Sequence, residues 1–516
     1  MNLQLYPWQK ECRHAWFEHG CRGIAGVVTG AGKTVMALSA MEELRRRLPV
    51  PLRVKIIVPQ TFLTSQWSCA MQKLAGIPRC EIGCYHGTHK DSTECPNMIY
   101  VINSARYTLS RHILRDINMG YAVLLIADEC HHYASAENRK IFEFLPYLPE
   151  QEKNFFSLGL SATPRTDGYE QYLIPALGPE IYRYTYEDAA IRSSIRPFVI
   201  FNIALTFTPE EHDSYQELSD RLTLLINKLY ARCPYLRKLD HIRFFHTLKH
   251  LSISAGSPHT AQLAQTALTL SYQRKSVVYN AAARTQCTLR LIEKLSPASR
   301  ILIFGERIEQ ADSLYKCLSR IYPNQTGRYH SQMEPEARKA ALDRYRSGEN
   351  RILVTCRALD EGFDIPSANI GIVLSSSSGE RQRIQRLGRI LRNFDGKRIT
   401  GLYYLYMESS SEPSAYMPET ETEQTCYPSL SLAYDSQSGR FVHPEYEARA
   451  HTVLTKLKNQ EKDPRILDEC RRCLSLGLLR PDWLMPEKDL EDLRKNASGK
   501  RMENYWICMK LMHQML

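Results

Sequence analysis

The stretch GIAGVVTGAGKT, residues 23–34, decides the fold. Its first six residues form an apolar, β-branched run that predicts a buried strand, and a helix opens directly after the glycines. Gly30 and Gly32 let backbone N–H groups close around a phosphate without interference from a Cβ atom. Lys33 adds a positive charge, and Thr34 offers a hydroxyl to Mg²⁺. The stretch therefore predicts a phosphate-binding loop between a strand and a helix.

Apolar runs of the same kind recur in two groups, each followed by a helix-like segment. Near-continuous apolar strands separated by helices predict a parallel sheet that is covered on both faces, so we expect two α/β units. The further runs lie at residues 54–58, 98–103, 122–127 and 155–160 in the first group, and at 300–304, 351–355, 369–374 and 402–406 in the second.

The segments outside these two groups have a helical pattern. Residues 198–297 show helical periodicity, and TPEE at 208–211 predicts a capped helix start. A Ser/Pro/Glu-rich linker is expected after Met407, and the remainder to residue 516 is mostly helical in pattern.

Bulk composition is that of a folded protein with several domains. The chain has 516 residues, too many for a single core, and no apolar run approaches the roughly 20 residues that span a bilayer. The start lacks a secretory signal, and 15 cysteines without a disulfide-like framework suit a reducing cytosol, so a cytoplasmic protein is expected. A formal charge of +11 favours a polyanionic partner.

The stretch LLIADECHHYASAEN, residues 124–138, ends the most apolar strand of the first group with Asp128 and Glu129. By residue type alone it suggests a transition-metal site. A phosphate-binding loop, however, needs a carboxylate at the end of a neighbouring strand to hold Mg²⁺, and Asp128 stands there. Adjacent residues at a strand end point in different directions, so Cys130, His131 and His132 cannot all converge on one ion, and magnesium is the favoured reading.

Other Cys and His groups give weaker metal signals. A zinc reading stays open for two of them, at lower weight than a structural role. These are Cys80, Cys84, His86 and Cys95 in one segment, and Cys470 with Cys473 in a single CxxC. His246 and His250 have helical spacing without a third ligand.

Because no (D/E)xK triplet follows Pro481 and Asp482, we expect no nuclease on this chain.

With these motifs in order, the chain resembles the superfamily 2 helicases and translocases. LYPWQ (5–9) is similar to the adenine-reading entry motif, VPQTFLTSQW (58–67) to motif Ia, DECH (128–131) to motif II and SATPRTDG (161–168) to motif III. VTCRALDEGFDIP (354–366) resembles motif V, and QRLGRILR (385–392) resembles motif VI. The last motifs look most like the branch that holds XPB-type repair helicases and type I and III restriction motors. Asn103 and Ser104 depart from the Thr common in a further strand-contact motif.

The resemblance implies two tandem RecA-like parallel-sheet domains with a helical insert between them and a mostly helical C-terminal region. The expected boundaries are 1–197 for the ATP-binding domain, 198–297 for the helical insert, 298–408 for the second RecA-like domain, and 409–516 for the linker and accessory region. ATP with Mg²⁺ is expected between the two α/β units, and nucleic acid on the opposite face, gripped through its backbone.

The same resemblance assigns roles to individual residues. Catalysis is assigned to Lys33, Asp128, Glu129, Gln385, Arg389 and Arg392, the two arginines acting as arginine fingers. Nucleotide binding is assigned to Gln9, Thr29, Gly30, Ala31, Gly32, Lys33, Thr34, Gly362 and Asp364, with Thr34 and Asp128 on Mg²⁺. Strand contacts are assigned to Gln60, Thr61, Thr64, Ser104 and Arg357, and coupling to His131, Ser161 and Thr163.

The expected function is an ATP-dependent helicase or translocase that acts on DNA, in repair, restriction or phage defence. Two alternatives stay open. One is an RNA helicase, because the motor grips backbone and its motifs do not enforce recognition of the 2′-OH. The other is a nucleic-acid-gated ATPase that signals to a partner without unwinding. A protein partner such as a nuclease or a defence-complex subunit is expected, and no membrane.

Overall fold

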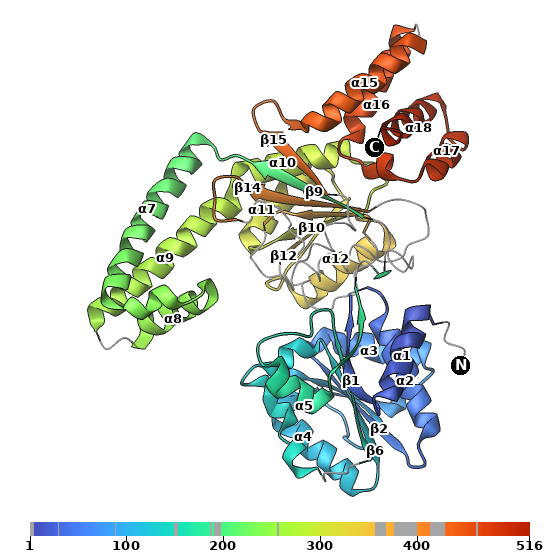
Figure 1. Cartoon of the computed structure of the whole chain (residues 1–516), viewed down its shortest axis with the longest axis vertical. Helices are drawn as coiled ribbons and strands as arrows, with labels where there is room; N and C mark the ends of the chain where they lie inside the picture. The colour runs from blue at the N-terminus through green and yellow to red at the C-terminus, as the bar shows by residue number, and fades with distance from the viewer. Residues whose placement is uncertain are drawn as a thin grey trace. The chain divides into compact units, whose positions relative to one another are not determined.

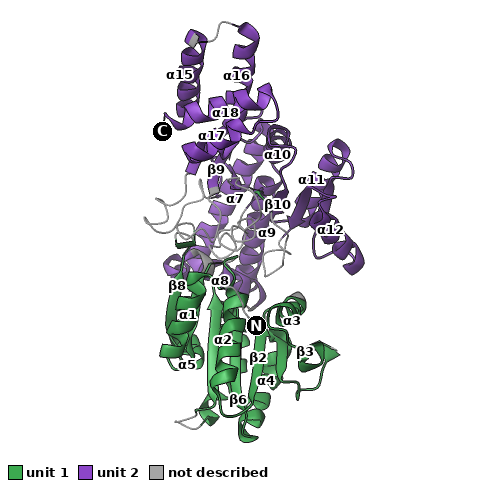
Figure 2. Cartoon of the chain, turned by 90° about the vertical axis from the view of Figure 1, so that its right-hand side faces the viewer, with its two compact units in different colours: residues 1–197, 358–369, 379–396 green, residues 198–357, 370–378, 397–516 purple. Residues whose placement is uncertain are grey.

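The computed structural model describes residues 5–28, 30–87, 89–148, 153–185, 188–189, 198–254, 257–356, 368–375, 400–412, 429–460 and 463–515. These residues form two compact units, coloured separately in Figure 2, and each unit is built on an eight-stranded sheet. Among the described helices, none combines the length and the apolar character needed to cross a membrane.

The sheet of the first unit has the strand order β4-β3-β5-β2-β6-β7-β1-β8. Its strands are parallel except for β4, which pairs antiparallel with β3. The interior strands are almost fully buried, as a parallel sheet covered on both faces requires. The strands are β1 (Arg22–Val27), β2 (Leu52–Val58), β3 (Ile82–His86), β4 (His89–Lys90), β5 (Asn97–Val101), β6 (Ala122–Asp128), β7 (Phe155–Ser161) and β8 (Glu180–Tyr184).

Helices connect these strands and cover the sheet (Figure 1). Because parallel strands all point the same way, the carboxyl ends of β5, β2, β6, β7 and β1 meet along one edge in that order. The segments that follow these five strands therefore lie side by side, although they come from distant parts of the chain. The helices of this unit are α1 (Pro7–Glu18), α2 (Lys33–Arg47), α3 (Thr61–Leu74), α4 (Ile102–Asn118) and α5 (Ile174–Leu177).

The sheet of the second unit has the order β11-β12-β10-β13-β14-β9-β15-β16 and is parallel except for the hairpin of β15 and β16. Its strands are β9 (Phe198–Leu205), β10 (Ile301–Gly305), β11 (Thr326–Tyr329), β12 (Ile352–Cys356), β13 (Ile370–Val373), β14 (Thr400–Met407), β15 (Ser429–Asp435) and β16 (Arg440–Val442). Helices α10 (Ala282–Lys294), α11 (Ile308–Ile321) and α12 (Pro335–Ser347) accompany them.

The predicted helical insert at 198–297 begins with a strand, which corrects the expected division at its first residues. Residues 198–205 form β9, which pairs along its full length with β14 and lies inside the second sheet. The run FVIFNIAL is apolar apart from Asn202, and the Asn202 amide donates a hydrogen bond to Ser429 Oγ at 3.0 Å. The neighbouring helical periodicity concealed this strand, which the apolar run itself indicates.

A helical arm follows β9, formed by α7 (Pro209–Arg232), α8 (His241–Ser254) and α9 (Pro258–Asn280), with α7 and α9 side by side (Figure 1). The predicted capped start is confirmed: Thr208 Oγ1 accepts from Glu211 N at 3.2 Å, and Glu211 Oε2 accepts from Thr208 N at 3.1 Å. The other oxygen, Glu211 Oε1, accepts from Ala282 N at 2.8 Å, so one carboxylate joins the first turn of α7 to the start of α10.

After residues 409–412, the described part of the C-terminal region resumes with the β15–β16 hairpin and continues as helices. The region is mostly helical, as expected; the hairpin is its exception, since β15 pairs with β9 in the second sheet. The helices are α15 (Pro444–Gln460), α16 (Pro464–Gly477), α17 (Glu487–Lys495) and α18 (Lys500–His513). Buried side chains such as Tyr446, Trp483 and Trp506 place them in the same core as the sheet.

Candidate active site

The predicted phosphate-binding loop lies at the carboxyl end of β1. Gly30 and Gly32 have φ of 90° and 100°, a left-handed conformation that glycine adopts without strain. Helix α2 begins at Lys33, and no side chain caps its first turn. The unpaired N–H groups and positive dipole end of a 15-residue helix are therefore available to an anion.

Gln9 of α1 holds this loop from behind. Its side-chain amide donates to the Gly32 carbonyl at 3.0 Å and accepts from Tyr6 N at 2.9 Å, and the residue is buried. A Cβ atom on Gly32 would lie 2.7 Å from Gln9 Nε2, so the contact requires glycine at position 32. In this structure the predicted base-reading residue is thus bonded within the protein.

Asp128 and Glu129 lie at the end of β6, across the edge from the loop. Lys33 Nζ lies 3.2 Å from Glu129 Oε1, with both side chains about one-tenth exposed. The carboxylates were expected on a strand next to β1, but β7 lies between β1 and β6 in the sheet. The long lysine side chain spans this distance. The structure therefore brings together Lys33 and Glu129, which are 96 residues apart in the chain.

The two carboxylates have opposite pKa shifts. Burial, together with the charge of Glu129, raises the pKa of Asp128 to about 6. Burial also opposes ionisation of Glu129, but the charges of Lys33 and His131 outweigh it and lower the pKa of Glu129. The pair therefore holds one carboxylate firmly ionised and one that protonates easily.

Trp67 of α3 is a site residue that the sequence motifs did not single out. Its indole N–H donates to Asp128 Oδ2 at 2.9 Å, and its side chain is 2% exposed. The Glu129 backbone N–H donates to the other oxygen, Asp128 Oδ1, at 3.1 Å. Each oxygen of Asp128 thus accepts one hydrogen bond, which fixes the plane of the carboxylate. The only signal in the sequence was the aromatic residue that ends VPQTFLTSQW.

The three predicted coupling residues form one hydrogen-bonded group. His131 Nδ1 lies 2.9 Å from Ser161 Oγ, and Ser161 Oγ accepts from Thr163 N at 3.1 Å. His131 Nδ1 also lies 3.5 Å from Glu129 Oε2. The segment after β6 is therefore linked to the segment after β7 through a buried histidine and a buried serine.

The predicted strand contacts follow β2 and β5, on the same edge. Gln60 precedes α3 as its N-cap residue and Thr61 begins the helix, where it is exposed. Thr64 is 4% exposed and its hydroxyl donates to the Thr61 carbonyl at 2.6 Å, so it is not presented to a strand. Ser104 Oγ accepts from Gly87 N at 3.1 Å.

Several predicted residues lie outside the described part of the chain. They are Thr29 in the phosphate-binding loop, Arg357, Gly362 and Asp364 in the motif V segment, and Gln385, Arg389 and Arg392 in the motif VI segment. Among the described residues, no group of three or more His, Cys, Asp or Glu side chains is arranged to hold a metal ion. Glu129 Oε2 is buried and accepts no hydrogen bond from the described residues.

The raised pKa of Asp128 predicts how the stability of the folded protein depends on pH. Above pH 6 the folded protein carries a buried carboxylate whose ionisation costs free energy; below the ordinary pKa of 3.8 it does not. Asp128→Asn removes this pH-dependent cost, but its amide nitrogen cannot accept the hydrogen bond of either Trp67 or Glu129, a loss that does not depend on pH. The melting temperature of the variant relative to the wild-type protein, without nucleotide, should therefore be higher by a few degrees at pH 8 than near pH 4. Thermal unfolding at several pH values measures this. A difference in melting temperature that does not change with pH would contradict the assignment.

Comparison with known proteins agrees with this geometry. Residues 2–166 match the family described as type III restriction enzyme, res subunit, and residues 283–394 match the helicase conserved C-terminal domain. The first match contains the phosphate-binding loop, Asp128, Glu129 and Ser161. The structure is also similar to the helicase domain of Pyrococcus furiosus Hef, with a TM-score of 0.50 and 17% identity, over 79% of this chain and 96% of that one.

Two relatives extend the comparison along the chain. A DNA 3'-5' translocase, XPB2 of Sulfurisphaera tokodaii, is 29% identical over 394 residues, which cover 76% of this chain and 80% of the relative. A DNA 3'-5' helicase, XPB of Kineococcus radiotolerans, is 25% identical over 75% of this chain and 57% of the relative. The protein described here therefore belongs to the superfamily 2 helicases and translocases, in the branch of the XPB-type and type III restriction motors.

Proposed function

We propose that this protein is an ATP-dependent DNA helicase or translocase that couples ATP hydrolysis to movement along DNA. The observation that carries the proposal is the ion pair of Lys33 and Glu129 at the edge where α2 begins. Lys33, the start of a helix and two carboxylates meet there, an arrangement that suits phosphoryl transfer. The names of the relatives favour DNA as the nucleic acid on which the protein acts.

The proposed chemistry starts from the contacts of the free protein. Lys33 neutralises Glu129; a bound triphosphate competes for the lysine ammonium and so leaves Glu129 free to orient the attacking water. Glu129 Oε2, which accepts no hydrogen bond from the described residues and lies 3.5 Å from His131 Nδ1, is suited to that water. The carboxylate of Asp128 and the hydroxyl of Thr34 fit Mg²⁺, a hard cation that takes oxygen ligands and keeps several waters. When bound, the ion would neutralise charge on the phosphates.

The remaining roles follow from the family resemblance. Arg389 and Arg392 act as arginine fingers, Gln385 belongs to the same catalytic group, and Gly362 and Asp364 help to hold the nucleotide. Arg357, Gln60, Thr61 and Ser104 grip the strand. We assign the nucleotide-binding domain to residues 1–197 and place β9, which follows it, in the second domain. We assign Mg²⁺ as the metal.

The competing functions are those of an RNA helicase and of a nucleic-acid-gated ATPase that does not unwind its substrate. Strand displacement on forked DNA and forked RNA duplexes, with and without ATP, separates them. Displacement of DNA strands in the presence of ATP supports the proposal. Stimulated hydrolysis without displacement of any strand excludes a helicase and leaves a translocase or a signalling ATPase, and displacement of RNA alone overturns the choice of DNA.

Removal of the lysine or the glutamate tests the ATP site. Lys33→Ala should lower DNA-stimulated ATP hydrolysis at least a hundredfold, and Glu129→Gln should do the same while still binding ATP. Hydrolysis and binding of a fluorescent nucleotide are measured on each variant. Lys73→Ala, at an exposed lysine of the same unit, is the control and should hydrolyse ATP normally. Normal turnover by Lys33→Ala would refute the proposed site.

Trp67→Phe tests whether the indole orients Asp128. The change removes one hydrogen bond to a carboxylate, worth roughly 1.5–3 kcal/mol, so kcat should fall about tenfold or more while the KM for ATP changes little. Trp16→Phe is a matched control, because Trp16 is also buried and its indole donates to the Ser157 carbonyl at 2.9 Å in the middle of β7. Equal loss of kcat in both variants would show a general structural effect.

Ser161→Ala tests the predicted coupling through His131. Loss of the hydroxyl breaks the links to His131 Nδ1 and Thr163 N, so strand displacement per ATP hydrolysed should fall about tenfold while hydrolysis persists. Ser157→Ala removes another buried hydroxyl from β7, one that donates to the Leu177 carbonyl, and should leave the ratio unchanged. Parallel assays of hydrolysis and displacement measure the ratio. An unchanged ratio in Ser161→Ala would exclude the coupling role.

A further inference from the structure

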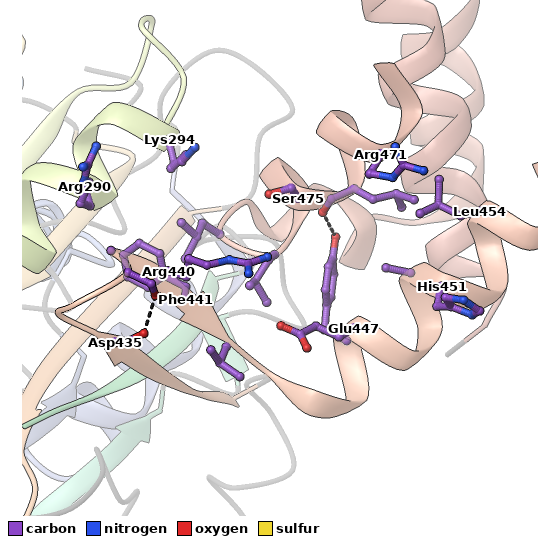
Figure 3. Close-up of a pocket in the computed structure, with 18 residues that line it drawn as sticks. Arg290, Lys294, Asp435, Arg440, Phe441, Glu447, His451, Leu454, Arg471 and Ser475 are labelled. Atoms are coloured by element: carbon purple, nitrogen blue, oxygen red, sulfur yellow. Dashed lines mark hydrogen bonds between the residues drawn. The ribbon is translucent and has the colours of Figure 1, made fainter. Parts of the chain in front are cut away.

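Two pockets flank helix α16 in the second unit, outside the predicted motifs. The first has a volume of about 730 Å³ and is lined by α10, the β15–β16 hairpin, α15 and α16. Figure 3 shows Arg290 and Lys294 from α10, Arg440 from the hairpin and Arg471 from α16 around it. The carboxylates in its lining are Asp435 and Glu447. Cations therefore outnumber carboxylates two to one.

The second pocket, of about 850 Å³, lies against a different set of α16 side chains and the start of α18. Its cations are Arg465, Arg472, Arg480, Lys500 and Arg501, and its carboxylates are Asp468 and Glu469. The whole chain has 67 Lys and Arg against 56 Asp and Glu, so both pockets are much richer in cations than the chain as a whole. The two sides of α16 that line these pockets thus both carry positive charge.

Much of this charge is not neutralised locally. Within the described part of the chain, no ion pair engages the side chains of Lys294 and Arg440 in the first pocket or of Arg465, Arg472 and Lys500 in the second. Four of these five residues are exposed and Lys294 is partly exposed. We call these five residues the α16 basic surface.

We propose that the α16 basic surface binds the phosphate backbone of nucleic acid, as an accessory contact outside the two motor sheets. Unpaired arginines and lysines on an exposed surface make the sequence-independent contacts that position a protein on a duplex. Each phosphate neutralised releases condensed counterions, which gives such a surface its binding free energy. The choice of nucleic acid over another polyanion rests on the proposed function.

The two sides of α16 allow the contact to extend along a backbone. The lining residues Arg465 and Arg472 lie two turns apart on α16, about 10 Å at 1.5 Å per residue, which is more than the roughly 3.4 Å of duplex axis that each phosphate of one strand occupies. Lys500 lines the same pocket from α18, and Lys294 and Arg440 line the pocket on the other side of the helix. The array therefore suits several phosphates rather than one small anion.

Binding of a 30-base-pair duplex without nucleotide tests the proposal. The triple variant Arg465→Gln/Arg472→Gln/Lys500→Gln and the double variant Lys294→Gln/Arg440→Gln are compared with the wild-type chain over a range of salt concentrations. The slope of log affinity against log salt should become shallower by about 0.9 for each cation that contacts a phosphate. The affinity of the triple variant near 0.1 M salt should fall about tenfold or more.

The control removes equal charge elsewhere in the same unit. Lys316→Gln/Arg320→Gln/Lys339→Gln replaces three exposed cations of α11 and α12 and should keep the wild-type slope. Triple and control variants with the same slope would overturn the proposal, as would lost affinity with an unchanged slope. ATP hydrolysis without DNA should be normal in all variants. Because the assay contains no nucleotide, a failure of the α16 basic surface is distinguishable from a failure of the ATP site.

Discussion

The shared direction of the strands in the first sheet is the constraint on which the site depends. Strands β5, β2, β6, β7 and β1 are adjacent and parallel, so the segments after them share one edge. In order along that edge lie Ser104, Gln60, Asp128, Ser161 and the phosphate-binding loop, from predicted strand contacts to predicted ATP contacts. Segments that follow neighbouring strands can therefore bond directly, as His131 after β6 and Ser161 at the end of β7 do.

Burial at this edge gives the site its chemistry and costs stability. Glu129 has a φ of 48°, a left-handed conformation that is unusual for a residue with a side chain, and Asp128 is disfavoured in its ionised form. The hydrogen bond from Trp67 and the charge of Lys33 offset part of that cost. Helix α3, which begins at the predicted strand contacts, is thus bonded directly to a predicted metal ligand.

The sequence predicts the parts of this site that are local in the chain. The phosphate-binding loop, the Asp128–Glu129 pair and the capped start of α7 each occupy a few consecutive residues with characteristic chemistry. The resemblance supplied the coupling role of His131, Ser161 and Thr163. The sequence did not identify Trp67 as a site residue because its partner Asp128 lies 61 residues away, and because an aromatic residue in a helix ordinarily indicates the core. Strand β9 was missed because the helical periodicity after it concealed its apolar run, and because its partner β14 lies 202 residues further along the chain.

The double hydrogen bonding of Glu211 has a topological meaning for the helical arm. Since this one carboxylate binds both Thr208 N and Ala282 N, the chain leaves and re-enters the second sheet's domain at nearly the same point. The arm is then a long loop whose two ends are held together. The entropic cost of closing such a loop grows only slowly with the number of residues in it. The arm can thus change in length or sequence over evolutionary time while the sheet beneath keeps its register.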